Sequence, residues 1–162
     1  MASKTTKYDL TEATDYLGFE SFCDDLMSRE GYKSIQPLGG TGDKGRDAIH
    51  FDKSTFISTV FAYSVRKDWE IKLSGDLKTV SRHEHNCDKF VFVSTSSITA
   101  TKFDEKKKEV KQTFGWDLDI FDLERIATLI DNQYRDLISL HSNIFHISSK
   151  IIGNVEKERP MV

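Results

Sequence analysis

The spacing of hydrophobic and polar residues predicts helices that alternate with strands. Apolar residues recur at helical spacing in some stretches, and shorter runs rich in β-branched and aromatic residues lie between them. The buried face of one expected helix is marked by apolar positions three or four residues apart. The expected helices cover residues 14–29, 67–83, 99–114, 123–130 and 134–140. The expected strands cover residues 32–38, 46–51, 56–64, 89–94 and 116–121.

The order of these elements, α-β-β-β-α-β-α-β-α-α, indicates an α/β fold. A β-hairpin followed by β-α-β units predicts a mixed sheet of about five strands with helices on both faces. The nearly continuous apolar run at 89–94 is typical of a strand covered on both sides. The stretch 116–121 alternates apolar and acidic residues, which favours a position nearer an edge.

The chain has 162 residues, the size of one domain. We expect a flexible N-terminal segment at 1–14, a folded domain at 15–147 and a linker or disordered tail at 148–162. Two cysteines, Cys23 and Cys87, cannot form a disulfide framework and suit a reducing cytoplasm. No apolar run reaches the length of a membrane span, so we expect a cytoplasmic protein without a membrane partner.

A glycine-rich stretch at residues 39–47 carries the candidate chemistry. Residues 40–45 match G-x-G-x-x-G, but they lead into a strand and not a helix, which argues against dinucleotide binding. Glycine allows close approach of a ligand, and Asp47, at the start of a buried strand, suits a metal ligand. A glycine-rich connection that simply turns is the structural alternative. The stretch from His83 to Cys87 is a weaker zinc candidate, because it lacks a second ligand cluster.

The run Gly42-Asp43-Lys44-Gly45-Arg46-Asp47 resembles the Mrr-like branch of the PD-(D/E)XK restriction endonuclease superfamily. It follows a helix containing Phe19-Glu20-x-Phe22, and the resemblance covers about residues 15–130. It implies a restriction-endonuclease-like fold and metal-dependent cleavage of DNA, with Mg²⁺ or Mn²⁺ as cofactor. On the family pattern, Asp47 and Glu20 are the metal ligands and catalytic carboxylates.

The chain departs from the family pattern on the strand after Asp47. That strand usually carries Glu or Gln, one intervening residue, then Lys, and this element falls at Ala62-Tyr63-Ser64. Ala62 offers no oxygen except its backbone carbonyl, and Ser64 carries no positive charge. The lysine normally stabilises the charged transition state. We therefore expect Lys72 to supply the cation and Ser64 to lie near the scissile phosphate; the alternative is that Lys72 is a solvated helix charge.

The resemblance also implies partners. The net charge is −3, so DNA binding has to come from a local patch. We expect a homo-oligomer or a fused sensor or NTPase module, in a bacterial restriction or antiphage defence protein. The rival hypothesis is a catalytically degenerate nuclease fold used for DNA binding or protein assembly. The expected DNA or phosphate contacts are Gly42, Asp43, Lys44, Gly45, Arg46, Arg66 and Lys67.

Overall fold

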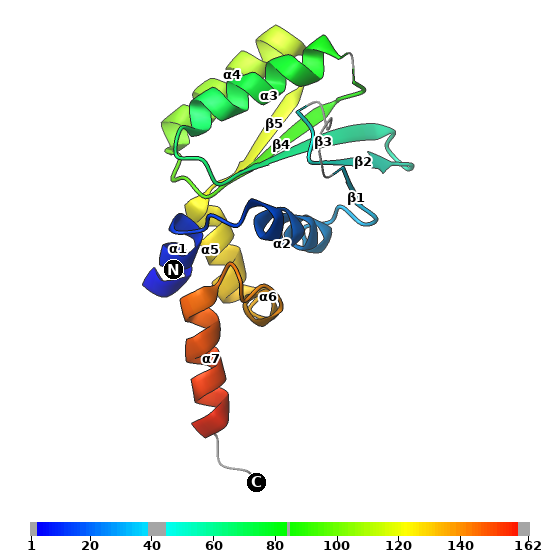
Figure 1. Ribbon diagram of the computed structural model, residues 1–162. Coiled ribbons are helices and arrows are strands. Elements are labelled where there is room, and N and C mark those ends of the chain that lie inside the picture. Colours follow the sequence, from blue (N-terminus) through cyan, green and yellow to red (C-terminus); the bar gives the residue numbers. More distant parts are fainter. Residues whose placement is uncertain (1–2, 39–44, 84, 159–162) are drawn as a thin grey trace.

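The structure, a computed structural model, describes residues 3–38, 45–83 and 85–158. Its centre is a five-stranded sheet in the order β1-β2-β3-β4-β5 (Figure 1). The first three strands pair antiparallel, and β3, β4 and β5 pair parallel. The strands are β1 (Gln36–Pro37), β2 (Ala48–Asp52), β3 (Ile57–Ser64), β4 (Lys89–Ser94) and β5 (Asp117–Phe121).

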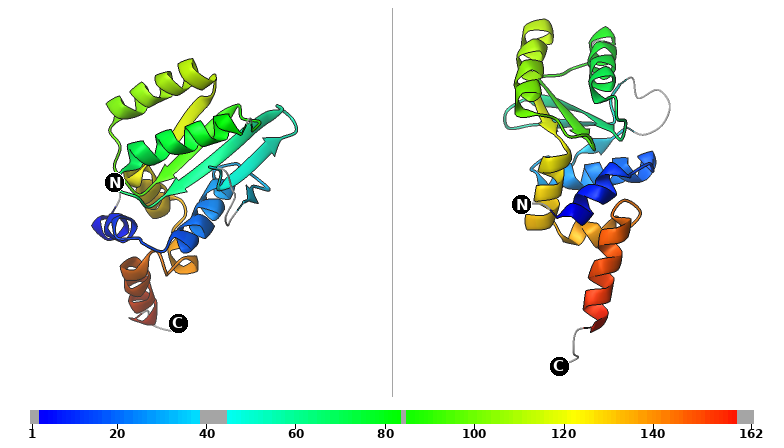
Figure 2. Two further views of the ribbon diagram at one scale, coloured as in Figure 1. Left: turned by 45° about the horizontal axis from the view of Figure 1, so that its top comes forward. Right: turned by 90° about the vertical axis from the view of Figure 1, so that its left-hand side faces the viewer.

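Helices cover both faces of this sheet. In Figure 1, α3 and α4 lie over one face, while α2 and α5 lie on the other side, beside α1. Helix α7 extends away from the sheet, and both further views show the same arrangement (Figure 2). The helices are α1 (Lys4–Thr11), α2 (Tyr16–Arg29), α3 (Trp69–Arg82), α4 (Ala100–Phe114), α5 (Leu123–Asn132), α6 (Asp136–Leu140) and α7 (His146–Glu158).

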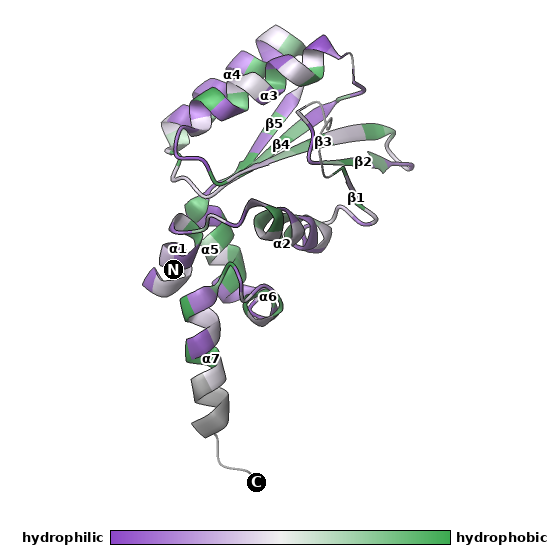
Figure 3. Cartoon of the chain, viewed as in Figure 1, coloured by the Kyte–Doolittle hydropathy of each residue, from purple (hydrophilic) through white to green (hydrophobic). Residues whose placement is uncertain are grey.

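Two hydrophobic cores form because side chains of a strand alternate between the faces of the sheet. From β3, Phe61 and Tyr63 pack into the core shared with α2 and α5, whereas Val60 and Ala62 pack into the core beneath α3. Strand β4 contributes to both cores and is apolar along most of its length (Figure 3). The sheet therefore holds β3 rigidly from both sides.

The expected fold class is confirmed. The sheet is mixed, has five strands and carries helices on both faces. Strand β5 lies at an edge and β4 lies in the interior, as their hydrophobic patterns predicted. The expected element order was incomplete, because it lacked a helix at each end of the chain.

The first correction concerns the N-terminal segment, which was expected to be flexible. Residues 4–11 form α1, and the side chain of Ser3 caps it by accepting a hydrogen bond from Thr6 N. Leu10 is fully buried, and Thr6 Oγ1 donates to Asp131 Oδ1 over 2.7 Å. The helix is therefore stabilised by contacts with a distant segment, which local sequence does not reveal.

The second correction concerns the expected tail. Residues 146–158 form α7, and the buried carboxylate of Asp9 accepts hydrogen bonds from Ile147 N (3.1 Å) and Ser148 N (2.8 Å) at its first turn. A carboxylate at this position satisfies backbone N–H groups that a helix start leaves without partners. The remainder of the expected tail, 159–162, lies outside the described residues.

Candidate active site

Asp47 lies immediately before β2, where the chain enters the sheet. Its backbone N–H donates to the Phe61 carbonyl on β3 (2.8 Å), and its own carbonyl accepts from Leu38 N (2.8 Å). The residue is 6% exposed. Both backbone groups and the side chain are thus held in place by the neighbouring segments.

Two donors fix the Asp47 carboxylate. Tyr63 N on β3 donates to Oδ2 over 2.6 Å, and the Tyr16 hydroxyl on α2 donates to Oδ1 over 2.8 Å. The same hydroxyl lies 3.4 Å from the Tyr63 carbonyl oxygen. The carboxylate of Asp47 and the carbonyl of Tyr63 therefore face the start of α2 together.

Helix α2 presents a polar stripe to this carboxylate. Tyr16, Glu20 and Asp24 are four residues apart, which places them on one face of the helix. The Tyr63 hydroxyl donates to Asp24 Oδ1 over 2.7 Å, so β3 contacts the stripe through its side chain as well. Asp15 caps the helix by accepting from Gly18 N, which fixes where the stripe begins.

Burial and negative charge perturb the titration of these groups. Burial, with the nearby charge of Glu20, raises the pKa of Asp47 to about 7, although the hydrogen bonds from Tyr63 and Tyr16 act in the opposite direction. Burial, with Glu20 again contributing, raises the pKa of Asp24 to about 6. Burial also raises the pKa of the Cys23 thiol, as do the three neighbouring carboxylates. The site therefore has an excess of negative charge.

This donor set fits a small divalent cation. Mg²⁺ prefers oxygen ligands and usually keeps several waters, so one or two carboxylates suffice to hold it. Glu20 lies close enough to Asp47 to disfavour the charged form of the Asp47 carboxyl, and a cation would relieve that repulsion. Among the described residues, no group of three or more His, Cys, Asp or Glu side chains is arranged as a metal cage. The arrangement thus suits a water-rich site better than a cage.

Three of the expected cations have other partners in this structure. Lys72 Nζ pairs with Asp76 Oδ1 on the same helix (3.0 Å), and Lys67 Nζ donates to the Thr11 carbonyl (2.7 Å). The Arg66 guanidinium pairs with Asp68 over 2.6 Å. The structure therefore brings together the two expected carboxylates, Asp47 and Glu20, but pairs Lys72, Lys67 and Arg66 elsewhere.

Ser64 is 1% exposed, and its hydroxyl oxygen accepts a hydrogen bond from Arg66 N over 3.1 Å. That bond turns the chain as it leaves β3. Ala62 packs into the core beneath α3, on the opposite face from Tyr63. Both departures from the family pattern therefore lie on a well-ordered central strand.

The end of the glycine loop packs closely on α3. Gly45 has a left-handed φ of 84°, and a Cβ there would lie 3.1 Å from the Asp76 carbonyl oxygen. Glycine is therefore required by both conformation and space. The expected contact residues Gly42, Asp43 and Lys44 lie outside the described residues.

Sequence reasoning missed Tyr16, Asp24 and Tyr63. Spacing of four residues on α2 was available as a signal for the first two, because it places them in line with Glu20. Nothing in the sequence indicated that the amide and hydroxyl of Tyr63 would contact carboxylates from two different segments.

Fold and site together define an α/β domain with a carboxylate site between the start of a sheet strand and a facing helix. A family model described as a restriction endonuclease, Mrr_cat, matches residues 11–130. The chain belongs to this family, and the expected resemblance is confirmed.

Beyond the family model, one solved structure is similar to the chain, at low sequence identity. No curated protein matches the chain. A solved structure described as "MspJI Restriction Endonuclease in Complex with 27-mer Oligonucleotide" is similar at a TM-score of 0.43 and 11% identity. The similarity covers 88% of this chain and 32% of that chain, so the chain spans about a third of that protein's length. Within the residues that the structure describes, no helix combines the length and apolar character needed to cross a membrane.

Proposed function

We propose that this chain is a metal-dependent endonuclease domain that cleaves DNA phosphodiester bonds. The observation that carries the proposal is the pair of neighbouring carboxylates, Asp47 and Glu20, on a domain of the restriction endonuclease family. Asp47 is fixed by two hydrogen bonds and by its backbone, which is the rigidity that a catalytic carboxylate needs.

In this proposal Asp47 and Glu20 hold Mg²⁺ or Mn²⁺. The metal ion supplies charge neutralisation at the phosphate and lowers the pKa of a bound water. Tyr16 and the Tyr63 amide orient the Asp47 carboxylate, and the hydrogen bonds they donate favour its ionised form. Tyr16 and Tyr63 are thus positioning residues for the metal ligand.

Lys72 and Ser64 act near the scissile phosphate in this proposal. When DNA is bound, the Lys72 ammonium would leave the Asp76 carboxylate and bind a phosphate oxygen. A phosphate can replace the carboxylate because both are anionic hydrogen-bond acceptors. Backbone and side chains of Gly45, Arg46, Arg66 and Lys67, with residues 42–44 of the loop, would contact the DNA backbone.

We further propose that the domain acts in the cytoplasm as the effector of a bacterial restriction or antiphage defence protein. Its partners would be DNA and either a second copy of the chain or a fused sensor or NTPase module. Membership of a restriction endonuclease family supports this role.

Plasmid nicking with Mg²⁺ or Mn²⁺ tests the endonuclease proposal. Asp47→Asn keeps the shape of the side chain but removes its charge, and we expect nicking to slow by roughly 100-fold or more. Asp104→Asn is the matched control, because this exposed carboxylate lies on α4, over the other face of the sheet. Equal nicking by wild type and Asp47→Asn would overturn the proposal, as would no nicking by wild type with either metal.

The rival, a degenerate nuclease fold that binds DNA or assembles with protein, is favoured by one specific observation. Lys72 pairs with Asp76, and Ser64, which stands at the position of the family lysine, is an uncharged residue buried on β3. Lys72→Gln separates the two functions. Under the endonuclease proposal it slows nicking and leaves metal-free DNA affinity largely intact; under the rival, neither wild type nor variant nicks DNA.

A further inference from the structure

We propose that a pocket beside the β2–β3 hairpin is a DNA-backbone subsite, which continues the candidate active site outward along β2. The inference rests on the proposed function in taking DNA as the partner. It assigns a binding role to residues that the carboxylate site does not use.

The pocket has a volume of about 650 Å³, and its lining combines cations and hydrogen-bond donors with the apolar side chains of Ile49 and Phe51. Arg46 and Lys53 contribute positive charge, and His50 and His85 contribute imidazoles. Amides of Gln36 and Asn86 also line it, together with hydroxyl groups. Its described lining residues include no carboxylate. Such a lining is complementary to an anionic ligand.

Carboxylates close to the hairpin are occupied by the chain's own donors. Asp52 Oδ1 accepts from both the backbone N–H (2.9 Å) and the hydroxyl (2.7 Å) of Ser54. Asp88 Oδ2 accepts from Ser58 N over 2.8 Å. Within the described part of the chain, neither carboxylate forms an ion pair with Lys53. The positive charge of Lys53 is therefore directed at solvent, where a phosphate could reach it.

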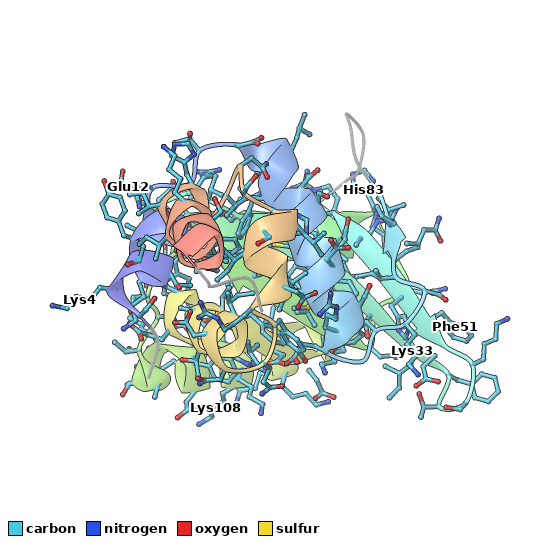
Figure 4. All side chains as sticks on the ribbon, turned by 90° about the horizontal axis from the view of Figure 1, so that it is seen from below. Lys4, Glu12, Lys33, Phe51, His83 and Lys108 are labelled. Carbon is cyan, nitrogen blue, oxygen red and sulfur yellow. The ribbon has the colours of Figure 1, made fainter. Side chains whose placement is uncertain are left out.

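Two exposed phenylalanines lie at the hairpin tip, and one of them, Phe51, lines the pocket. Phe51 is 51% exposed and Phe56 is 73% exposed, and their ring centroids lie 6.3 Å apart. Figure 4 shows Phe51 at the outer end of the hairpin. Phe56 also has a left-handed φ of 60°, which is costly for a residue with a bulky side chain. Exposed aromatic rings beside cations are typical of surfaces that bind DNA strands.

One residue of the pocket lining adjoins the candidate active site in the sequence. Arg46 immediately precedes Asp47, and Lys53 follows the last residue of β2. At a rise of about 3.4 Å per residue, the backbones of these two residues, seven positions apart, are separated by at most roughly 24 Å. DNA advances about 3.4 Å per nucleotide along each strand. A backbone whose scissile phosphate lies at Asp47 could therefore continue over the pocket for several nucleotides.

A matched pair of charge variants tests this assignment. Lys53→Gln and Lys108→Gln remove the same charge from exposed positions, but Lys108 lies on α4, and Figure 4 shows it well apart from Phe51 and the hairpin. The affinity of each full-length protein for a labelled duplex and a labelled single strand is measured by fluorescence anisotropy in EDTA. We expect Lys53→Gln to weaken binding about three- to tenfold and to reduce the slope of log affinity against log salt by about 1. Lys108→Gln should stay within about twofold of wild type.

The two DNA forms distinguish what the pocket holds. A larger loss on duplex indicates the backbone of double-stranded DNA, and a larger loss on the single strand indicates an unpaired strand; both outcomes support the subsite. Equal affinities of the two variants on both DNA forms would overturn it, as would a wild type that binds neither form. The binding measurement is made in EDTA, where no cleavage occurs, so it does not depend on the outcome of the nicking experiment. The endonuclease proposal and the subsite proposal can therefore fail separately.

Discussion

The hydrogen bonds to Asp47 and its buried, negatively charged surroundings have opposite effects on the pKa of its carboxyl group. Tyr16 and Tyr63 donate to its oxygens and favour the carboxylate, while burial and Glu20 disfavour it and raise its pKa to about 7. A bound divalent cation would favour the ionised carboxylate, because a proton and a metal ion compete for the same oxygens. In the proposed endonuclease, a metal ion bound at Asp47 would supply the counter-charge.

The raised pKa of Asp47 makes the stability of the metal-free protein depend on pH. Between pH 4 and about 7, the unfolded chain loses the Asp47 proton while the folded chain keeps it, so folding stability falls as pH rises. Asp47→Asn cannot titrate. We therefore expect the free energy of unfolding of Asp47→Asn to improve relative to wild type across this range, as measured by urea unfolding in EDTA. A difference that does not change with pH would contradict the raised pKa; Asp104→Asn is the control.

Residue-level prediction from sequence succeeded where a motif was local. Asp47 and Glu20 lie in short stretches that resemble a family pattern, and the structure brings them together. Tyr63 was missed because its two roles depend on Asp47 and Asp24, which come from separate elements. The cation near the phosphate stays a prediction, since Lys72 pairs with Asp76 in this structure.

The β2–β3 hairpin places an exposed aromatic ring on a residue with an unfavourable backbone conformation, Phe56. Phe56 adopts a left-handed conformation that glycine would adopt at little cost, and its side chain gains little burial in return. Backbone strain that is not offset by local packing is often found at functional positions. The hairpin tip is therefore better explained by a partner than by folding.

Phe56→Gly separates these explanations. Relief of the left-handed conformation should raise the free energy of unfolding by about 1 kcal/mol, whereas loss of the ring should weaken DNA binding. We expect the two effects in opposite directions, measured by urea unfolding and by anisotropy in EDTA. Thr55→Gly is the matched control, because its backbone φ is not left-handed and added flexibility should only destabilise it. A Phe56→Gly protein that binds DNA as tightly as wild type would refute a role for the ring.

Strands were predicted better than terminal helices for a physical reason. Strands β3 and β4 carry apolar runs long enough to identify them, and 89–94 matches β4 at both ends, whereas the strand expected at 32–38 is only the two residues of β1. Helix α1 buries few apolar side chains and depends on Asp131, while the start of α7 depends on Asp9. Polar contacts across more than a hundred residues leave no periodic signal in the sequence.

In the proposed endonuclease, each copy of the chain has one candidate active site, whereas duplex DNA has two strands to cut. One Asp47 site can cut one strand, so double-strand cleavage needs a second copy, and a symmetric dimer is the commonest way to supply it. The proposed subsite on the hairpin would then extend the DNA contact of each copy away from its own cleavage position.

Mixing experiments test this requirement. We expect wild type alone to convert plasmid to linear DNA at high protein concentration and to nicked circles at low concentration. An excess of Asp47→Asn should shift the product toward nicked circles, because mixed pairs contain one working site; an excess of Asp104→Asn should not. Sedimentation that shows only monomers on DNA would count against pairing.

The carboxylate of Asp9 at the first turn of α7 joins the two ends of the described chain. Its consequence concerns local unfolding. If α1 detaches, the first turn of α7 loses its acceptor and Leu10 leaves the core, so heat or a protease that opens one end also loosens the other. We therefore expect the terminal helices to unfold together, as a unit that extends beyond the 120 residues, 11–130, matched by the family model.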